Sequence, residues 1–185
     1  MKYVCVYPNA LTYSETQYLR DAMDHARSCD EHRVDRRPNC DAEVFWVWDR
    51  RAKTKLIRSR LLSVAAHANH TNFKFDPLLK VESLVVNRYS QSAVSYRGWH
   101  YDGGYSSKSR TNKYRKLSVV VQLCTDYEYT GSELQFLNGH KPKESMLGLG
   151  TAIVFPAYEP HRASMLMSGV RYSAALFVTG KEPFR

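Results

Sequence analysis

The phrase Trp99-His100-Tyr101-Asp102 places an imidazole and a carboxylate two residues apart. In a β-strand, residues i and i+2 point to the same face, so His100 and Asp102 would project together. Such a pair makes two thirds of a 2-His-1-carboxylate facial triad, which holds Fe(II) on one side and leaves positions open for substrates. Because His-x-Asp pairs often arise by chance, the motif needs a third ligand elsewhere in the chain.

His161 is the candidate for that third ligand. It follows residues 151–156, a run that is typical of a strand ending at a loop. The sequence therefore predicts an iron site made by His100, Asp102 and His161.

Ten residues after that last histidine comes Arg171, followed by Ser173. On a strand these two side chains share a face. A guanidinium pairs with a carboxylate through two parallel hydrogen bonds, and a buried one is costly without such a partner. Arg171, helped by the Ser173 hydroxyl, would suit the far carboxylate of a dicarboxylic acid whose near end chelates iron. If Arg171 were only a surface residue at a strand start, Arg88 or Arg162 would be the next candidates.

The first half of the chain must supply elements that support this site. Ser14 and Gln17 have the spacing of a capping box, and the apolar residues that follow have helical spacing. Residues 43–48 predict a strand, and residues 52–68 predict a second helix whose basic residues face solvent. The apolar stripe of the first helix is Leu19, Ala22, Met23 and Ala26.

The second half consists of short strands separated by turn residues. Helices followed by many short strands indicate an α+β domain, a β-sandwich or barrel with helices packed on one face. No internal repeat or linker divides the chain, so we expect one domain over residues 1–185, with support in 1–81 and the core in 82–180. The predicted strands are 83–89, 116–123, 133–137, 151–155 and 172–179.

Taken together, the motifs resemble the Fe(II)- and 2-oxoglutarate-dependent dioxygenases. The resemblance covers about residues 82–180. Within the family, these stretches resemble the prolyl 4-hydroxylase-like branch. It implies a double-stranded β-helix, which is a cupin-like jelly roll, with N-terminal helices against one sheet. The stretches that carry it are Val86 to Tyr89, Lys116 to Leu123, Gly131 to Phe136, Ile153 to Arg162 and Ser168 to Ser173.

The resemblance also implies a reaction. An enzyme of this family converts 2-oxoglutarate and O2 to succinate and CO2 while hydroxylating a substrate C–H bond, and ascorbate is a candidate reductant. His100, Asp102 and His161 would ligate iron, while Arg171 with Ser173 would bind the distal carboxylate of 2-oxoglutarate.

Two further residues, Tyr89 and Gln122, fall where this branch often makes polar contacts to 2-oxoglutarate. Gln122 departs from the tyrosine common in some relatives, and Ser132 replaces the second glycine of a Gly-Gly-Glu motif. The second departure leaves the predicted iron ligands untouched.

The substrate stays open between two enzymatic alternatives and one non-enzymatic one. The branch resemblance favours a prolyl or other side chain of a peptide or protein. The net charge of +9 favours the same chemistry on a nucleic acid or nucleotide, unless the basic clusters are only solvated faces. A β-sandwich binding module with an inert site is the third alternative. The clusters are Arg50, Arg51, Lys53, Lys55, Arg58 and Arg60, and Lys108, Arg110, Lys113, Arg115 and Lys116.

The short chain resembles the compact bacterial and viral members of that family, which implies a cytoplasmic enzyme, and its sequence predicts no membrane partner. No apolar run is long enough to cross a bilayer, and the N-terminus lacks the pattern of a secretory signal. The four cysteines form no regular framework, which favours free thiols in a reducing compartment. The sequence names neither the primary substrate nor the oligomeric state.

Some residues near these motifs have weaker interpretations. Residues 103–116, with two glycines and five basic residues, are a candidate lid. His67 and His70 could pair on a metal but fit a solvated helix end better. Several tyrosines flank the iron motif and could line an entrance cleft, namely Tyr101, Tyr105, Tyr114, Tyr127 and Tyr129.

Overall fold

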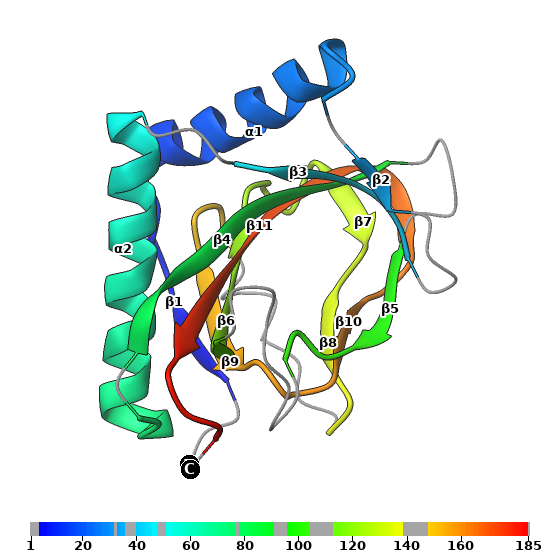
Figure 1. Cartoon of the computed structure of the whole chain (residues 1–185). Coiled ribbons are helices and arrows are strands. Elements are labelled where there is room, and N and C mark those ends of the chain that lie inside the picture. The colour runs from blue at the N-terminus through cyan, green and yellow to red at the C-terminus, as the bar shows by residue number, and fades with distance from the viewer. Residues whose placement is uncertain are drawn as a thin grey trace.

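The strands of the computed structural model form two facing layers, joined by strands that pass from one layer to the other (Figure 1). The structure describes residues 4–31, 33–35, 40–47, 51–76, 78–90, 96–103, 113–138 and 148–184. Its elements are β1 (Cys5–Tyr7), α1 (Tyr13–Ser28), β2 (Arg33–Asp35), β3 (Cys40–Trp46), α2 (Ala52–Ala68), η1 (Asn69–Phe73), β4 (Leu78–Ser90), β5 (Tyr96–His100), β6 (Tyr114–Gln122), β7 (Tyr129–Gly131), β8 (Leu134–Phe136), β9 (Ala152–Pro156), β10 (His161–Ala163) and β11 (Leu166–Gly180).

The larger layer has the strand order β1-β9-β6-β11-β4-β3, and the smaller layer has β5-β10-β8. Strand β3 pairs with β4 in the first layer and with β5 in the second. Strand β11 pairs with β4 and β6 and then, at its other end, with β7. This arrangement confirms the predicted double-stranded β-helix with helices against one sheet.

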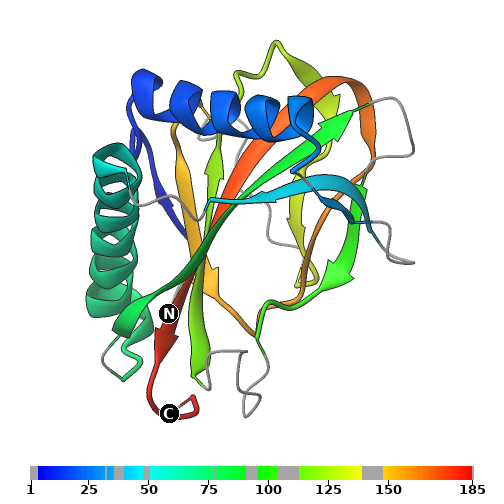
Figure 2. The same cartoon turned by 45° about the horizontal axis from the view of Figure 1, so that its top comes forward.

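The helices α1 and α2 cover the face of the larger layer that points away from the smaller one (Figure 2). Helix α1 begins with a capping box made by Thr12 and Glu15, so the predicted pair of Ser14 and Gln17 was wrong by two residues. Thr12 takes this position because its backbone is extended while Tyr13 is already helical.

Strand β11 shows how the two faces of the larger layer differ. Ala174, Leu176 and Val178 are buried in the main core between this layer and the helices. The alternate residues Arg171 and Ser173 are buried on the opposite face, because successive side chains of a strand point to opposite sides. Burial of each large aliphatic side chain contributes about 1.5–3 kcal/mol, so the helix-facing side stabilises the sheet, while the opposite face also holds buried polar groups.

The two basic clusters differ in their exposure and their contacts. On α2, Lys53, Lys55 and Arg60 are exposed or half-exposed, as expected for a solvated helix face. Lys116, in contrast, is fully buried, and its Nζ donates to the carbonyl of Pro183 at 2.7 Å. Arg115 pairs through two nitrogens with Glu82. These last two residues therefore hold the fold together.

Part of the candidate lid, residues 104–112, lies outside the described residues together with Lys108 and Arg110. The remainder of that segment is not a loop throughout, because strand β6 begins at Tyr114. Among the helices that the structure describes, none has the length and apolarity required to cross a membrane.

Candidate metal and co-substrate site

The two histidines of the predicted iron site lie side by side at the edge of the smaller layer. His100 ends β5 and His161 begins β10, and the two residues are direct partners in the antiparallel pair. Their ring centroids are 4.2 Å apart. Strand pairing alone therefore brings together two residues that are 61 positions apart in the chain.

Asp102 reaches the same place from a turn, not from the strand that the sequence predicted. Its backbone N–H and that of Gly103 both donate to the carbonyl of Ala157 at 2.9 Å. These two hydrogen bonds hold the turn against the segment between β9 and β10. Asp102 Oδ1 lies 3.7 Å from His100 Nε2, and Oδ2 lies 3.4 Å from His161 Nε2.

Backbone carbonyls set the tautomer of both imidazoles. The Nδ1–H of His100 donates to Gly98 O at 2.7 Å, and that of His161 donates to Glu159 O at 2.8 Å. The Nε2 lone pairs are therefore directed toward Asp102. One ligand atom from each of the three residues lies within 4.8 Å of the others, so the donor set fits a divalent metal ion.

The electrostatics keep the site in its ligating protonation state. Burial is the largest cause that lowers the pKa of His100, to about 4, and the charges of Arg97 and His161 add to it. Burial works against ionisation of Asp102, but the positive charge around it and a hydrogen bond from Ser118 hold its pKa below the ordinary value. At neutral pH the set is therefore a neutral imidazole beside a carboxylate, which is the form that binds metal.

Two residues that sequence reasoning missed hold Asp102 in position. The Ser118 hydroxyl donates to Asp102 Oδ2 at 2.6 Å, and Arg115 Nη1 donates to the Asp102 carbonyl at 3.1 Å. The only signal in the sequence was a lone serine within an apolar strand, which pointed to no particular partner.

The predicted co-substrate residues gather on the facing layer. Arg171 and Ser173 of β11 are cross-strand partners of Tyr89 in β4 and Gln122 in β6, respectively. All four side chains are buried. Arg171 Nη2 donates to Gln122 Oε1 at 3.2 Å, and the guanidinium carbon lies 5.5 Å from the centre of the Tyr89 ring. The structure thus brings together every residue that the sequence assigned to 2-oxoglutarate.

Arg171 lacks the partner that a buried guanidinium needs. Its side chain is 4% exposed, and its Nε is buried without a hydrogen-bond partner. No carboxylate of the described residues forms an ion pair with it. Arg88, in contrast, is paired with Glu43, and Arg162 is only partly buried and donates to Gln135. Of these three candidates, Arg171 is therefore the buried arginine without an acidic partner, as expected for one that binds an added carboxylate.

Tyr129 belongs to this pocket as well. Gln122 Nε2 donates to the Tyr129 hydroxyl, and the Arg171 guanidinium carbon lies 5.8 Å from the Tyr129 ring centre. Tyr129, one of the tyrosines that could line an entrance cleft, thus packs beside the predicted co-substrate residues.

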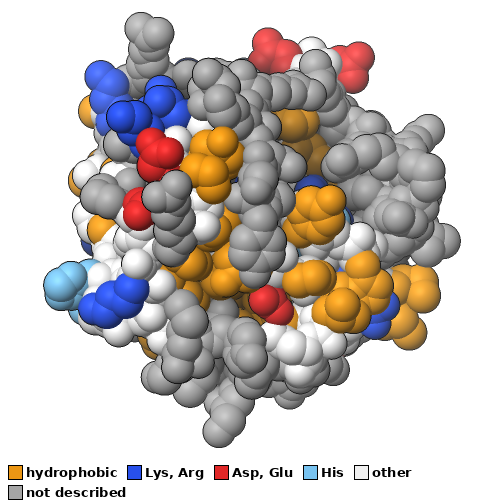
Figure 3. All heavy atoms as spheres, turned by 60° about the horizontal axis from the view of Figure 1, so that its bottom comes forward, with side chains coloured by type: hydrophobic (Ala, Val, Ile, Leu, Met, Phe, Trp, Pro, Cys, Tyr) orange, Lys and Arg blue, Asp and Glu red, His pale blue; other side chains and the backbone are white. Residues whose placement is uncertain are grey.

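Three large apolar side chains close in sequence to the predicted metal ligands or their strands are exposed. Trp99 and Tyr101, which flank His100 in sequence, are both exposed, and so is Leu137, which follows β8. Figure 3 shows hydrophobic side chains at several places on this end of the molecule, with single charged groups among them. Tyr127 is also exposed, while Tyr105 lies outside the described residues.

The alternative histidine pair shows no metal site. His67 and His70 are exposed on α2 and η1, and His67 packs edge-on against Tyr7. Within the described ranges, His100, Asp102 and His161 form the only group of three or more such side chains able to hold a metal. His32 and His140 lie outside those ranges.

Comparison with known proteins gives one clear sequence relative. A PKHD-type hydroxylase of Synechococcus sp. (strain CC9605) is 32% identical over 125 residues, covering 67% of this chain and 54% of the relative. The chain thus spans about half the length of that relative. No family model matches the chain.

Solved structures agree on the fold. The viral collagen prolyl hydroxylase of Paramecium Bursaria Chlorella virus-1, solved with 2-oxoglutarate, has a TM-score of 0.70 at 20% identity and covers 97% of both chains. A Pseudomonas putida prolyl-4-hydroxylase has a TM-score of 0.73 at 14% identity, over 97% of this chain and 94% of the other. A Trichoplax adhaerens prolyl hydroxylase, solved with a hypoxia inducible factor peptide fragment, has a TM-score of 0.72 at 14% identity, over 96% and 83%.

Proposed function

We propose that this chain, a relative in sequence and fold of the prolyl 4-hydroxylase-like Fe(II)- and 2-oxoglutarate-dependent oxygenases, hydroxylates a C–H bond of a peptide substrate. The overall reaction would consume 2-oxoglutarate, O2 and the C–H substrate and release succinate, CO2 and the alcohol. Bound Fe(II) and 2-oxoglutarate would supply the oxidising chemistry, while the protein positions and shields the reactants.

The observation that carries the proposal is the unpaired guanidinium of Arg171, buried on the layer that faces the three metal-type ligands. A buried charge without a partner is strongly destabilising, so this pocket is built for an anion that arrives with a ligand. The distal carboxylate of 2-oxoglutarate has the planar shape that a guanidinium binds in a bidentate manner.

The residues around the metal-type ligands and around Arg171 would have separate roles. The carbonyls of Gly98 and Glu159 would keep the Nε2 atoms of both histidines free for Fe(II). Ser118 would hold one oxygen of Asp102 so that the other is directed to the metal. On the opposite layer, Ser173, Tyr89 and Gln122 would complete the shell around the distal carboxylate.

A peptide is the substrate class that these features favour. Tyr101, which follows His100, and Leu137, which follows β8, are exposed apolar side chains close in sequence to the predicted metal site and would suit a peptide side chain. The exposed basic residues of α2 lie on the outer side of the larger layer, away from the metal ligands (Figure 1). The nucleic-acid alternative therefore gains no support from their position.

We further propose that residues 1–185 act as one catalytic domain in the cytoplasm. The continuous pairing of strands from β1 to β11 supports one domain. Cys5, Cys29 and Cys124 are free thiols, which supports a reducing compartment.

The proposed function is tested by a product screen. Purified protein is supplied with Fe(II), 2-oxoglutarate, ascorbate and O2 and is mixed with either proline-containing peptides or single-stranded oligonucleotides. We expect mass spectrometry to detect the gain of one oxygen atom in peptides, and no gain with the His161→Ala variant. Oxygen incorporation into oligonucleotides but not into peptides would show that the substrate is a nucleic acid.

A further inference from the structure

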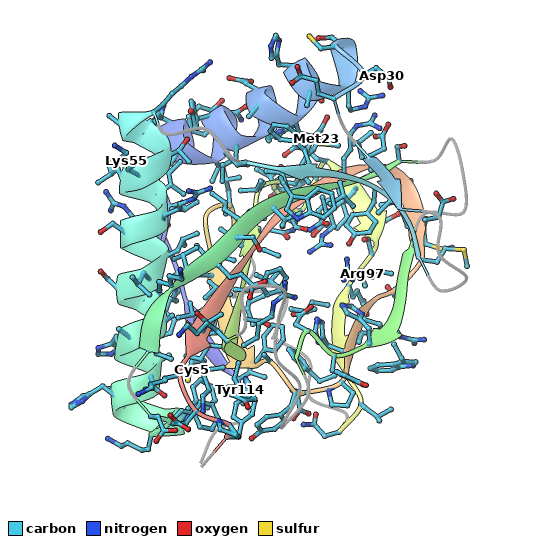
Figure 4. The ribbon with its side chains drawn as sticks, in the orientation of Figure 1. Cys5, Met23, Asp30, Lys55, Arg97 and Tyr114 are labelled. Carbon is cyan, nitrogen blue, oxygen red and sulfur yellow. The ribbon has the colours of Figure 1, made fainter. Side chains whose placement is uncertain are left out.

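Arg97 lies on the same face of β5 as the metal ligand His100, although the two are three residues apart. The pairing with β10 explains this, because His100 is opposite His161 while Arg97 is opposite Ala163. Three steps along β5 therefore match two steps along β10, which marks a bulge with one extra residue. Figure 4 shows Arg97 directed from β5 toward the interior between the two layers.

The contact that Arg97 makes is incompatible with a bound metal. Its Nε–H donates to His100 Nε2 at 2.7 Å. The other ring nitrogen of His100 already donates to Gly98 O, so Nε2 has a single lone pair to offer. A metal ion at His100, Asp102 and His161 needs that same lone pair. Metal binding must therefore release the Arg97 guanidinium.

Once released, Arg97 would be a cation beside the metal, and the nearby carboxylate of Asp102 would be occupied as a metal ligand. Among the described residues, no carboxylate forms an ion pair with Arg97, in contrast to the nearby Arg115, which is paired with Glu82. An arginine in such a position needs an anion, and a carboxylate is the anion that matches its planar fork.

We propose that Arg97 is a carboxylate-binding residue of the active site, which is set free when a metal ion binds His100. This inference rests on the proposed function, because it requires the metal. The carboxylate could belong to an acidic side chain of the primary substrate or to 2-oxoglutarate itself. The first source is favoured, since Arg171 and the metal between them already serve both ends of 2-oxoglutarate. The substrate class would then be an acidic peptide.

The test compares Arg97→Gln with Arg162→Gln, which removes the same charge from the neighbouring strand β10. Arg162 on β10 points to the outer face, where it packs over Trp99 and donates to Gln135. Arg162→Gln is therefore the control for non-specific effects of charge. Each protein is loaded with Mn(II) in the absence of O2 and is titrated with 2-oxoglutarate. The complex is then dialysed against two pools of short proline peptides, which differ only by Asp or Asn next to the proline.

We expect wild-type protein and Arg162→Gln to retain the Asp pool about tenfold or more over the Asn pool, and Arg97→Gln to lose this preference. We also expect Arg97→Gln to bind Mn(II) several-fold more tightly than wild type, because the competing hydrogen bond and the nearby charge are gone. If Arg97→Gln instead weakens 2-oxoglutarate binding and the pools are retained equally, the carboxylate belongs to 2-oxoglutarate.

Equal retention of both pools, with unchanged affinities for Mn(II) and 2-oxoglutarate in Arg97→Gln, would overturn the proposal. A wild-type protein that binds neither Mn(II) nor 2-oxoglutarate would contradict the proposed function itself, and the role of Arg97 would fall with it.

Discussion

The two halves of the site differ in how their polar groups are satisfied. On the smaller layer, both histidines and Asp102 have partners that fix their orientation, from the carbonyl of Gly98 to the hydroxyl of Ser118. On the larger layer, Arg171 is buried with one neutral amide partner and an unsatisfied Nε. The first half is organised without a ligand, and we expect the second to be completed by one. Changes in the two halves should therefore have separable effects.

The largest expected effect is on metal binding by the smaller layer. His161→Ala removes one of three ligands and should lower Mn(II) or Fe(II) affinity below the range detectable by calorimetry. His67→Ala, which removes an exposed histidine on α2, is the control and should bind as wild type does. Full metal affinity in His161→Ala would show that the metal site lies elsewhere.

Arg171→Leu should separate the two halves most clearly. Without the guanidinium, the distal carboxylate of 2-oxoglutarate would be desolvated and unpaired, a loss of about 3–5 kcal/mol or two or more orders of magnitude in affinity. Affinity for Mn(II) should stay within a few-fold of wild type. Arg171→Lys should be impaired less, because charge survives while the bidentate fork is lost. Unchanged 2-oxoglutarate affinity in Arg171→Leu would make Arg171 a merely structural arginine.

Ser118→Ala should have a smaller effect, confined to the metal half. The variant removes the donor that holds Asp102 Oδ2, and loss of such a supporting hydrogen bond lowers metal affinity about 10–100-fold. Ser63→Ala, on the exposed face of α2, is a matched control. Equal metal affinity in the two variants would show that the turn alone positions Asp102.

Protonation of His100 should have the smallest effect, on the stability of the metal-free protein. The pKa of His100 is lowered from 6.5 to about 4, so the unfolded chain binds more protons between these values. The stabilisation from neutral His100 is therefore complete above pH 6.5 and is lost as pH falls toward 4. Between pH 7 and 4.5, the melting temperature of wild type should fall more steeply than that of His100→Gln. Parallel curves for the two proteins would contradict this assignment.

Much of this molecule could be predicted from its sequence, because the motifs are local. The double-stranded β-helix and the likeness to prolyl 4-hydroxylases are confirmed, and the ligand residues and Arg171 with its neighbours are brought together as expected. The pairing rule of alternate faces worked for Arg171 and Ser173 because β11 is regular at that point.

What the sequence could not predict depends on irregular backbone or distant partners. The bulge in β5 turns Arg97 to the same face as His100, and alternation of side chains would have placed it on the other face. Lys116 looked like part of a solvated basic cluster, but residues from the C-terminal end of the chain cover it. Neither the bulge in β5 nor the burial of Lys116 leaves a recognisable pattern in the local sequence.

The most direct test of the account is the release of succinate from 2-oxoglutarate. Wild-type protein, Arg171→Leu and His161→Ala are incubated in air with 2-oxoglutarate and a responsive peptide, with and without Fe(II), and succinate is measured by NMR. At low 2-oxoglutarate we expect succinate only from wild type with Fe(II). At high 2-oxoglutarate and with Fe(II), Arg171→Leu should recover partly, while His161→Ala stays inactive. Iron-independent succinate, or equal rates from all three proteins, would contradict it.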